Sequence, residues 1–125
     1  MRPLTRALVI LVLPALAAQV LKDEAKIKPD AKALEKRFKI LKERFDPDRR
    51  RYVWVLEATL SSEAPCHFDA EFQDPDDKEV TSIQVEFEDG GKRTVQGEKY
   101  RAYVKYPTRK TMEKVTQIVI KKSDQ

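Results

Sequence analysis

The longest run of alternating apolar positions outside the N-terminal segment covers residues 52–60. Its even-numbered residues include Trp54, Leu56, Ala58 and Leu60, and the residues between them are more mixed in character. A period of two places successive side chains on opposite faces of a β-strand. This pattern predicts a central strand, with Trp54 in the core.

Shorter runs of the same kind follow, separated by turn residues. Residues 66–73 alternate without a fault, so that Cys66, Phe68, Ala70 and Phe72 are expected to face inward. Clusters of Asp with Pro or Gly at 74–77 and 89–92, and Gly97 followed by Glu98 and Lys99, are typical of chain reversals. The expected later strands are one defined by Ile83, Val85 and Phe87, a short one around Thr94 and Val95, one at 100–106 and a last one at 115–121.

Residues 31–45 satisfy two patterns at once. Ala31, Leu34, Phe38, Leu41 and Phe45 have the spacing of one apolar helical face, and Asp30 is suited to cap a short helix. Alternatively, the helix ends early and an edge strand begins near Phe38, because the turn residues 46–49 would fold such a strand back onto 52–60. The local spacing favours the helix, whereas the fold argument favours the strand.

The first 18 residues have the organisation of a secretory signal peptide. Arg2 and Arg6 precede an apolar run at 7–16, and Ala15 and Ala17 are small residues at cleavage positions. The run is shorter than the ~20 residues that cross a bilayer, although an uncleaved anchor is the alternative. We expect export to the periplasm or the extracellular space, with no stable membrane insertion after cleavage. The expected organisation is a signal peptide at 1–17, a polar spacer with a short helix at 18–36, a β-sandwich domain at 37–122 and a polar tail at 123–125.

Composition limits the partners and the chemistry. The 125 residues are 41% hydrophobic and 37% charged, which suits one domain with a densely ionic surface. The formal net charge is +4, but two of the positive charges belong to Arg2 and Arg6. The remaining excess is too small to indicate nucleic acid as a partner.

Six or seven short strands at intervals of about 8 to 12 residues predict a mainly β fold, an antiparallel sandwich, and the resemblance described next makes the expected sandwich immunoglobulin-like. Two short motifs fit this expectation: Phe72-Gln73-Asp74 followed by Glu79-Val80, and Gly97-Glu98-Lys99-Tyr100. Through them, residues 50–121 resemble FxLYD-type immunoglobulin-like modules of exported bacterial proteins. Asp77 departs from that pattern, since it stands where a turn Gly is expected, and no Gly-x-x-x-Asn signal follows Tyr52. The resemblance implies a noncatalytic sandwich and supplies no binding residues.

Enzymatic patterns are missing from the sequence. Cys66 and His67 are the only cysteine and histidine, and as neighbours on a strand they would point to opposite faces. There is no G-x-S-x-G elbow, and the three glycines at 90, 91 and 97 cannot form a phosphate-binding loop. We expect a noncatalytic protein without a cofactor, in which Cys66 is a buried structural thiol.

One loop has the composition of a weak calcium site. Its carboxylates, a hard ligand type that calcium favours, are Asp74, Asp76, Asp77 and Glu79. The spacing is not that of an EF-hand, and Lys78 adds a positive charge within the loop. An ordinary acidic turn is the favoured interpretation.

Charge is segregated into a basic, an acidic and a second basic block along the chain. Acidic middle strands are expected to pair with basic outer strands, which include Lys121, and a binding face for a charged partner is the alternative. Tyr103 lies off the inward parity of its strand and is a candidate for stacking on a ligand. The candidate partner surface comprises Asp69, Glu71, Glu86, Glu88, Arg101, Tyr103 and Lys105.

These observations lead to two hypotheses of function. The first is a noncatalytic interaction or accessory module of the bacterial envelope, whose partner is an envelope protein or polysaccharide. The second is a calcium-dependent or carbohydrate-binding β-sandwich domain.

Overall fold

The computed structural model describes residues 23–91 and 93–123, so the predicted signal peptide lies outside the described residues. Within these ranges the chain is mainly β, with seven antiparallel strands in two sheets and a few short helical turns. No helix in the described ranges is long and apolar enough to cross a membrane. The mainly β fold class is therefore confirmed.

The elements follow the predicted order closely. The helical turns are η1 (Glu24–Lys26), α2 (Lys32–Glu35) and α3 (Arg109–Met112). The strands are β1 (Phe38–Asp46), β2 (Arg51–Ala58), β3 (Phe68–Gln73), β4 (Glu79–Gln84), β5 (Glu86–Phe87), β6 (Lys99–Lys105) and β7 (Gln117–Lys122).

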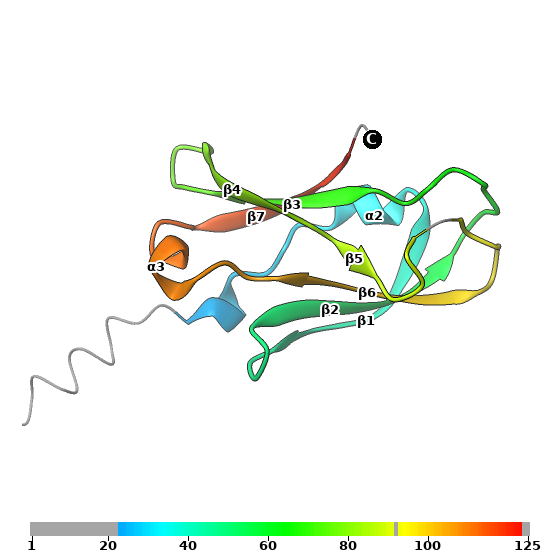
Figure 1. The fold of residues 1–125 in the computed structure, drawn as a ribbon, viewed down its shortest axis with the longest axis horizontal. Helices are drawn as coiled ribbons and strands as arrows, with labels where there is room; N and C mark the ends of the chain where they lie inside the picture. Colours follow the sequence, from blue (N-terminus) through cyan, green and yellow to red (C-terminus); the bar gives the residue numbers. More distant parts are fainter. Residues whose placement is uncertain (1–22, 92, 124–125) are drawn as a thin grey trace, which may run out of the picture.

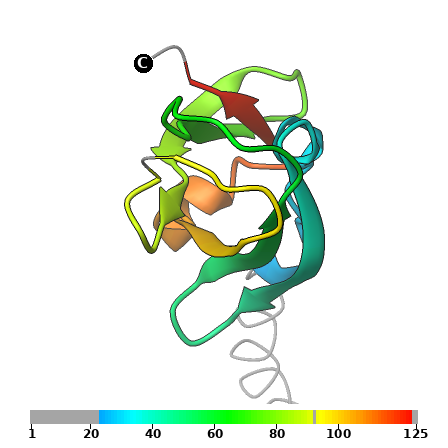
Figure 2. The same ribbon diagram turned by 90° about the vertical axis from the view of Figure 1, so that its right-hand side faces the viewer.

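Two sheets lie face to face, with the strand orders β1-β2-β6-β5 and β4-β3-β7. Figure 1 shows them as two layers, and Figure 2 shows the same layers from one end. Strand β2 is hydrogen-bonded to β1 on one side and to β6 on the other. The prediction of a central strand at this position is confirmed.

The single strand expected through Ile83, Val85 and Phe87 is wrong, because the chain changes sheets within it. Strand β4 pairs with β3, whereas β5 pairs with β6. Val85 lies between them, is buried, and donates its N–H to Phe68 O at 2.8 Å. The change of sheet ties the two layers together along one side of the core (Figure 1).

Residues 31–45 form a short helix followed by a strand, as the fold argument predicted. A bulge between Ile40 and Lys42 explains the competing helical pattern. Phe38 and Phe45 are seven residues apart and would lie on opposite faces of a regular strand. The bulged residue, Leu41, restores the parity, so Phe38 is buried and Phe45 also packs against the core.

The segment predicted to be a polar spacer takes part in the core. Leu34 is fully buried, and Ala31 is nearly so. Asp30 forms a parallel bridge with Val119: its N–H donates to Ile118 O and its carbonyl accepts from Ile120 N, both at 2.9 Å. This segment therefore covers part of the outer edge of β7.

The core lies between the two sheets and follows the predicted inward parity. The Trp54 side chain is fully buried, and the expected inward residues of the run beginning at Cys66 are all buried. Leu60 lies beyond the end of β2 and is 42% exposed. The largest fully buried side chains are those of Trp54, Phe38, Phe72, Leu34, Leu56, Met112, Ile118, Val85, Val104 and Val115.

The short strand expected around Thr94 and Val95 is not formed. Thr94 makes only an isolated bridge with Ser62, through two backbone hydrogen bonds of 3.0 and 2.9 Å. Its hydroxyl donates to Leu60 O and accepts from Arg37. A strand would have needed a longer series of backbone hydrogen bonds, whereas this loop is held by one backbone bridge and by side-chain hydrogen bonds.

Candidate functional site

The acidic turn between β3 and β4 is organised by its own hydrogen bonds. Asp74 Oδ1 accepts the backbone N–H groups of Asp76 and Lys78 at 2.8 and 3.0 Å. Asp77 adopts φ 63°, a left-handed conformation that Asp tolerates better than most residues, and its carboxylate accepts from Gln117 Nε2. In residues 23–91 and 93–123, no group of three or more His, Cys, Asp or Glu is arranged to hold a metal.

Cys66 and His67 are placed as the strand parity predicted. The Cys66 thiol is buried, and desolvation raises its pKa. The Cys66 N–H donates to the carbonyl of Gly91, whose φ of +65° suits a glycine. His67 is only half-buried and lines a surface groove. The predicted burial of Cys66 is confirmed, and its structural role stays a prediction.

Two ion pairs join the acidic and basic groups that were expected to pair across the sheets. Lys121 Nζ lies 3.0 Å from Glu71 Oε1, and Arg101 Nε lies 3.6 Å from Glu88 Oε2. The pKa of Glu71 is lowered, first by the Gln73 amide that donates to its carboxylate and then by Lys121. Part of the segregated charge therefore serves internal pairing.

The candidate partner residues divide between the two sheets. Asp69 and Glu71 belong to β3 in the three-stranded sheet. The other five, which belong to or adjoin β5 and β6 of the four-stranded sheet, are Glu86, Glu88, Arg101, Tyr103 and Lys105. The structure thus brings this second group together and separates it from the first.

The register of the four-stranded sheet places further side chains beside that group. Arg44, Val53, Tyr103 and Glu86 are successive partners across β1, β2, β6 and β5. Their neighbours in sequence, such as Trp54 and Ala102, are buried, so this row faces outward. Adjacent strands lie about 4.8 Å apart, and the row therefore forms a continuous strip.

Basic residues dominate this outer surface. Lys42 pairs in register with Val55, and Val55 pairs with Arg101. We define the basic face as the outward-facing cations of β1, β2 and β6 together with three less polar outward residues. The cations are Lys39, Lys42, Arg44, Arg51, Lys99, Arg101 and Lys105, and the other three are Val53, Val55 and Tyr103. The carboxylates that share this sheet surface are Asp46, Glu57, Glu86 and Glu88.

Neutralisation of the basic face is uneven. Arg51 and Arg101 each have a carboxylate within ion-pair distance, at 3.5 and 3.6 Å. Lys42, Arg44 and Lys105 are exposed and form no ion pair with another residue of the described ranges. Positive charge on both sides of the strip formed by Val53 and Tyr103 is therefore only partly offset, by the longer-range attraction between Arg44 and Asp46.

Arg51 fixes the aromatic part of the face. Its guanidinium carbon lies 4.5 Å from the centre of the Tyr103 ring, a cation–π arrangement, while its Nε lies 3.5 Å from Asp46 Oδ2. Burial desolvates Asp46 and acts to raise its pKa, but hydrogen bonds from the backbones of Arg49 and Asp48, with nearby arginines, lower the pKa overall. The Asp46 carboxylate therefore stays ionised beside Arg51, but it gives the buried Arg51 Nε an ion-pair contact and no hydrogen bond.

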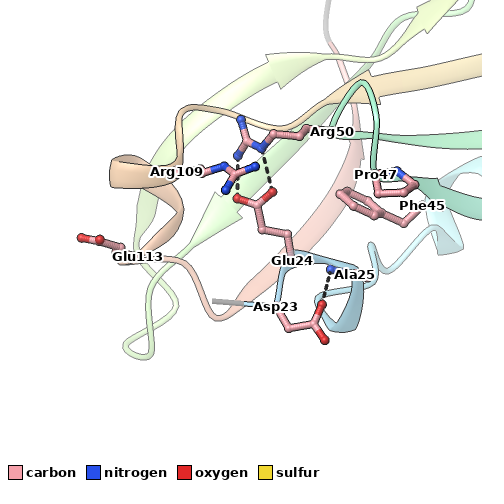
Figure 3. Close-up of a pocket in the computed structure, with 8 residues that line it drawn as sticks. All are labelled: Asp23, Glu24, Ala25, Phe45, Pro47, Arg50, Arg109 and Glu113. Carbon is pink, nitrogen blue, oxygen red and sulfur yellow. Dashed lines mark hydrogen bonds and ion pairs between the residues drawn. The ribbon is translucent and has the colours of Figure 1, made fainter. Parts of the chain in front are cut away.

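A separate pocket of about 190 Å³ lies at the end of the molecule near η1 (Figure 3). Arg50 crosses it, with Nε and Nη2 at 2.8 and 2.5 Å from the Glu24 carboxylate and Nη2 at 2.7 Å from Pro107 O. The pair joins the N-terminal turn to the β1–β2 hairpin and to the chain after β6. The polar groups of Arg50 and Glu24 are therefore used to link parts of the chain that are distant in sequence, and we interpret the pocket as part of that link.

The contributors from β1 and β2 to the basic face were not among the predicted surface residues. Lys42, Glu43 and Arg44 are three charged residues in a row, so they show no alternation, and the bulge at Leu41 reverses the parity before them. Recognising the bulge from the odd spacing of Phe38 and Phe45 would have placed both cations outward.

Comparisons with known proteins identify no relative. No family model, curated protein or solved structure matches the chain.

Proposed function

We propose that this chain is a noncatalytic, exported interaction module of the bacterial envelope, which binds an acidic protein segment or an acidic polysaccharide on its basic face. The observation that supports the proposal is a set of cations around Val53 and Tyr103 that form no ion pair with the part of the chain that the structure describes, namely Lys42, Arg44 and Lys105. The face is built on paired strands rather than on loops, so its side chains are held in a regular array.

The chemistry of this array suits an extended anionic polymer. Successive outward residues along a strand are about 6.6 to 6.8 Å apart, and the three strands β1, β2 and β6 repeat that spacing side by side. A polymer with repeated negative charges would meet several cations at once. The partly buried Val53 and Tyr103 add apolar contact area at the centre, as in many interfaces.

The test compares the mature chain from Ala18 with the triple variant Lys42→Glu, Arg44→Glu, Lys105→Glu. Two fluorescent probes, polygalacturonate and a poly-glutamate peptide, distinguish a polysaccharide partner from a protein partner. The matched control reverses three exposed lysines away from the basic face: Lys26→Glu, Lys110→Glu and Lys114→Glu. Both variants change the net charge equally.

The expected result is salt-sensitive binding of at least one probe, weakened about tenfold or more in the basic-face variant and much less in the control. Equal weakening in both variants would show nonspecific attraction by net charge, and would contradict the proposal. Absence of binding of either probe to the unaltered chain at low salt would also contradict it.

Export is supported by the N-terminal segment, in which Arg2 and Arg6 precede an apolar run ending near Ala17. Mass spectrometry of the protein recovered from a bacterial periplasm or medium tests this part. Cleavage after Ala17 or Ala18 is expected, and retention of Met1 on exported protein would contradict it.

A further inference from the structure

A second concave region lies where α2, the loop after β2 and the end of β7 meet. It has a volume of about 480 Å³, within the range of small-molecule sites. Its apolar lining includes Ala33, Leu60, Pro65, Phe68 and Ile120. Leu60 is the more exposed of the two large hydrophobic side chains on the surface of the described ranges, at 42%. We call this region the groove.

The groove also carries a concentration of positive charge. Lys36, Arg37, Lys121 and Lys122 line it together with His67, and no Asp or Glu does. Lys121 is paired with Glu71, whereas Lys36 and Lys122 form no ion pair within the described part of the chain. Electrostatic complementarity therefore calls for an anionic group on any ligand.

Arg37 is the fixed member of this group. Its guanidinium donates to Ala64 O at 2.6 Å, to Pro65 O at 3.4 Å and to Thr94 Oγ1 at 3.1 and 3.2 Å. All these acceptors are neutral, so the half-buried positive charge is oriented but not neutralised. An anion beside it would gain a charge-assisted interaction without reordering the side chain.

Most backbone polar groups of the loop that borders the groove already form hydrogen bonds within the protein. Ser62 N and O are bonded to Thr94, and the carbonyls of Ala64 and Pro65 accept from Arg37. A peptide would bring backbone groups that find few partners on this wall, and unpaired buried polar groups are costly. An acyl chain brings no such groups and suits the apolar lining.

We propose that the groove binds an amphiphile with an acyl chain and a carboxylate head. The chain would lie against Ala33, Leu60, Phe68 and Ile120, and the carboxylate would meet Arg37 with Lys36 or Lys122. This site shares no residue with the basic face, so variants can alter either site without changing a residue of the other.

Isothermal titration with dodecanoate, below the concentration at which it aggregates, tests the proposal on the mature chain. Three variants are compared: Leu60→Asp, the double variant Lys36→Glu with Lys122→Glu, and Val95→Asp. Val95 is the other exposed large hydrophobic residue, at 38%, and does not line the groove. It is therefore a matched control for Leu60. Dodecanol serves as the uncharged probe, and an amidated peptide that alternates Glu and Leu serves as the peptide probe.

We expect saturable binding of dodecanoate that weakens about tenfold or more in Leu60→Asp and in the double lysine variant, and that is retained in Val95→Asp. Dodecanol should bind more weakly than dodecanoate. No binding of dodecanoate, or equal binding by Leu60→Asp and the unaltered chain, would overturn the proposal. Tighter binding of the peptide than of dodecanoate would overturn it in favour of a protein partner.

Discussion

Lys121 Nζ lies 3.0 Å from Glu71 Oε1, although the residue opposite Lys121 in the β3–β7 register is Asp69. The ion pair is therefore diagonal across the two strands. The Glu71 side chain is 18% exposed and also accepts from Gln73 Nε2, so its position is fixed from two sides. Among the described residues Asp69 forms no ion pair, so Lys121 pairs with its diagonal neighbour and not with the residue opposite it.

A double-mutant cycle on this pair should show weak but real coupling. We expect Glu71→Gln and Lys121→Gln to interact by about 0.5 kcal/mol, because half of the lysine side chain is in water and surface pairs contribute little. Denaturant unfolding of the four proteins provides the values. The coupling should shrink near 1 M NaCl, where the screening length is ~3 Å. The cycle that combines Asp69→Asn with Lys121→Gln is the control and should show less coupling. A larger coupling energy for Asp69 than for Glu71 would contradict the diagonal pairing.

Stability should fall in acid partly through Glu71. Its pKa is lowered in the folded protein, chiefly by Gln73 and then by Lys121, so the folded state binds a proton less readily than the unfolded state. The contribution of Glu71 to the free energy of unfolding is therefore complete above the ordinary Glu pKa of about 4.3. It is lost as the pH falls through the lower pKa of Glu71 in the folded protein. Urea unfolding between neutral pH and pH ~3 should show that the free energy of unfolding falls less steeply in Glu71→Gln than in the unaltered protein. An identical pH profile for both proteins would refute this assignment.

Trp54 should be among the most costly residues to truncate. Its side chain is fully buried, and its ring lies 5.2 Å from that of Tyr52 in an edge-on arrangement. We expect Trp54→Ala to lower the free energy of unfolding by about 3 to 5 kcal/mol. Val53→Ala, on the opposite face of the same strand, should lower it by about 1 kcal/mol or less. A loss below about 1 kcal/mol for Trp54→Ala would mean that the ring is not a core residue.

The Cys66 thiol should be unreactive while the protein is folded. Burial raises its pKa, which reduces the thiolate fraction, and the packing around it limits access. At pH 8 we expect the thiol reagent DTNB to modify native protein far more slowly than protein unfolded in guanidinium chloride. Comparable rates in the two states would show that the thiol is exposed.

The sequence alone determined the strand interiors. The alternation in β2, β3 and β6 identified Trp54, Phe72 and Val104 as inward, because burial of one sheet face is a local and periodic requirement. The segregated charge also predicted that acidic middle strands pair with basic outer strands, and the pairs Glu71–Lys121 and Glu88–Arg101 are of this kind. These features depend on residue type and on the alternation of residues along a strand, and both can be read directly from the sequence.

Only the tertiary structure decided which surfaces exist. The bulge at Leu41 and the change of sheet at Val85 depend on fitting one strand to its neighbours, and no local periodicity encodes that fit. The basic face needs β1, β2 and β6 side by side, and the groove needs α2 docked beside β7. Such sites are formed by residues distant in sequence, so their chemistry becomes visible only when long-range packing has set the strand order.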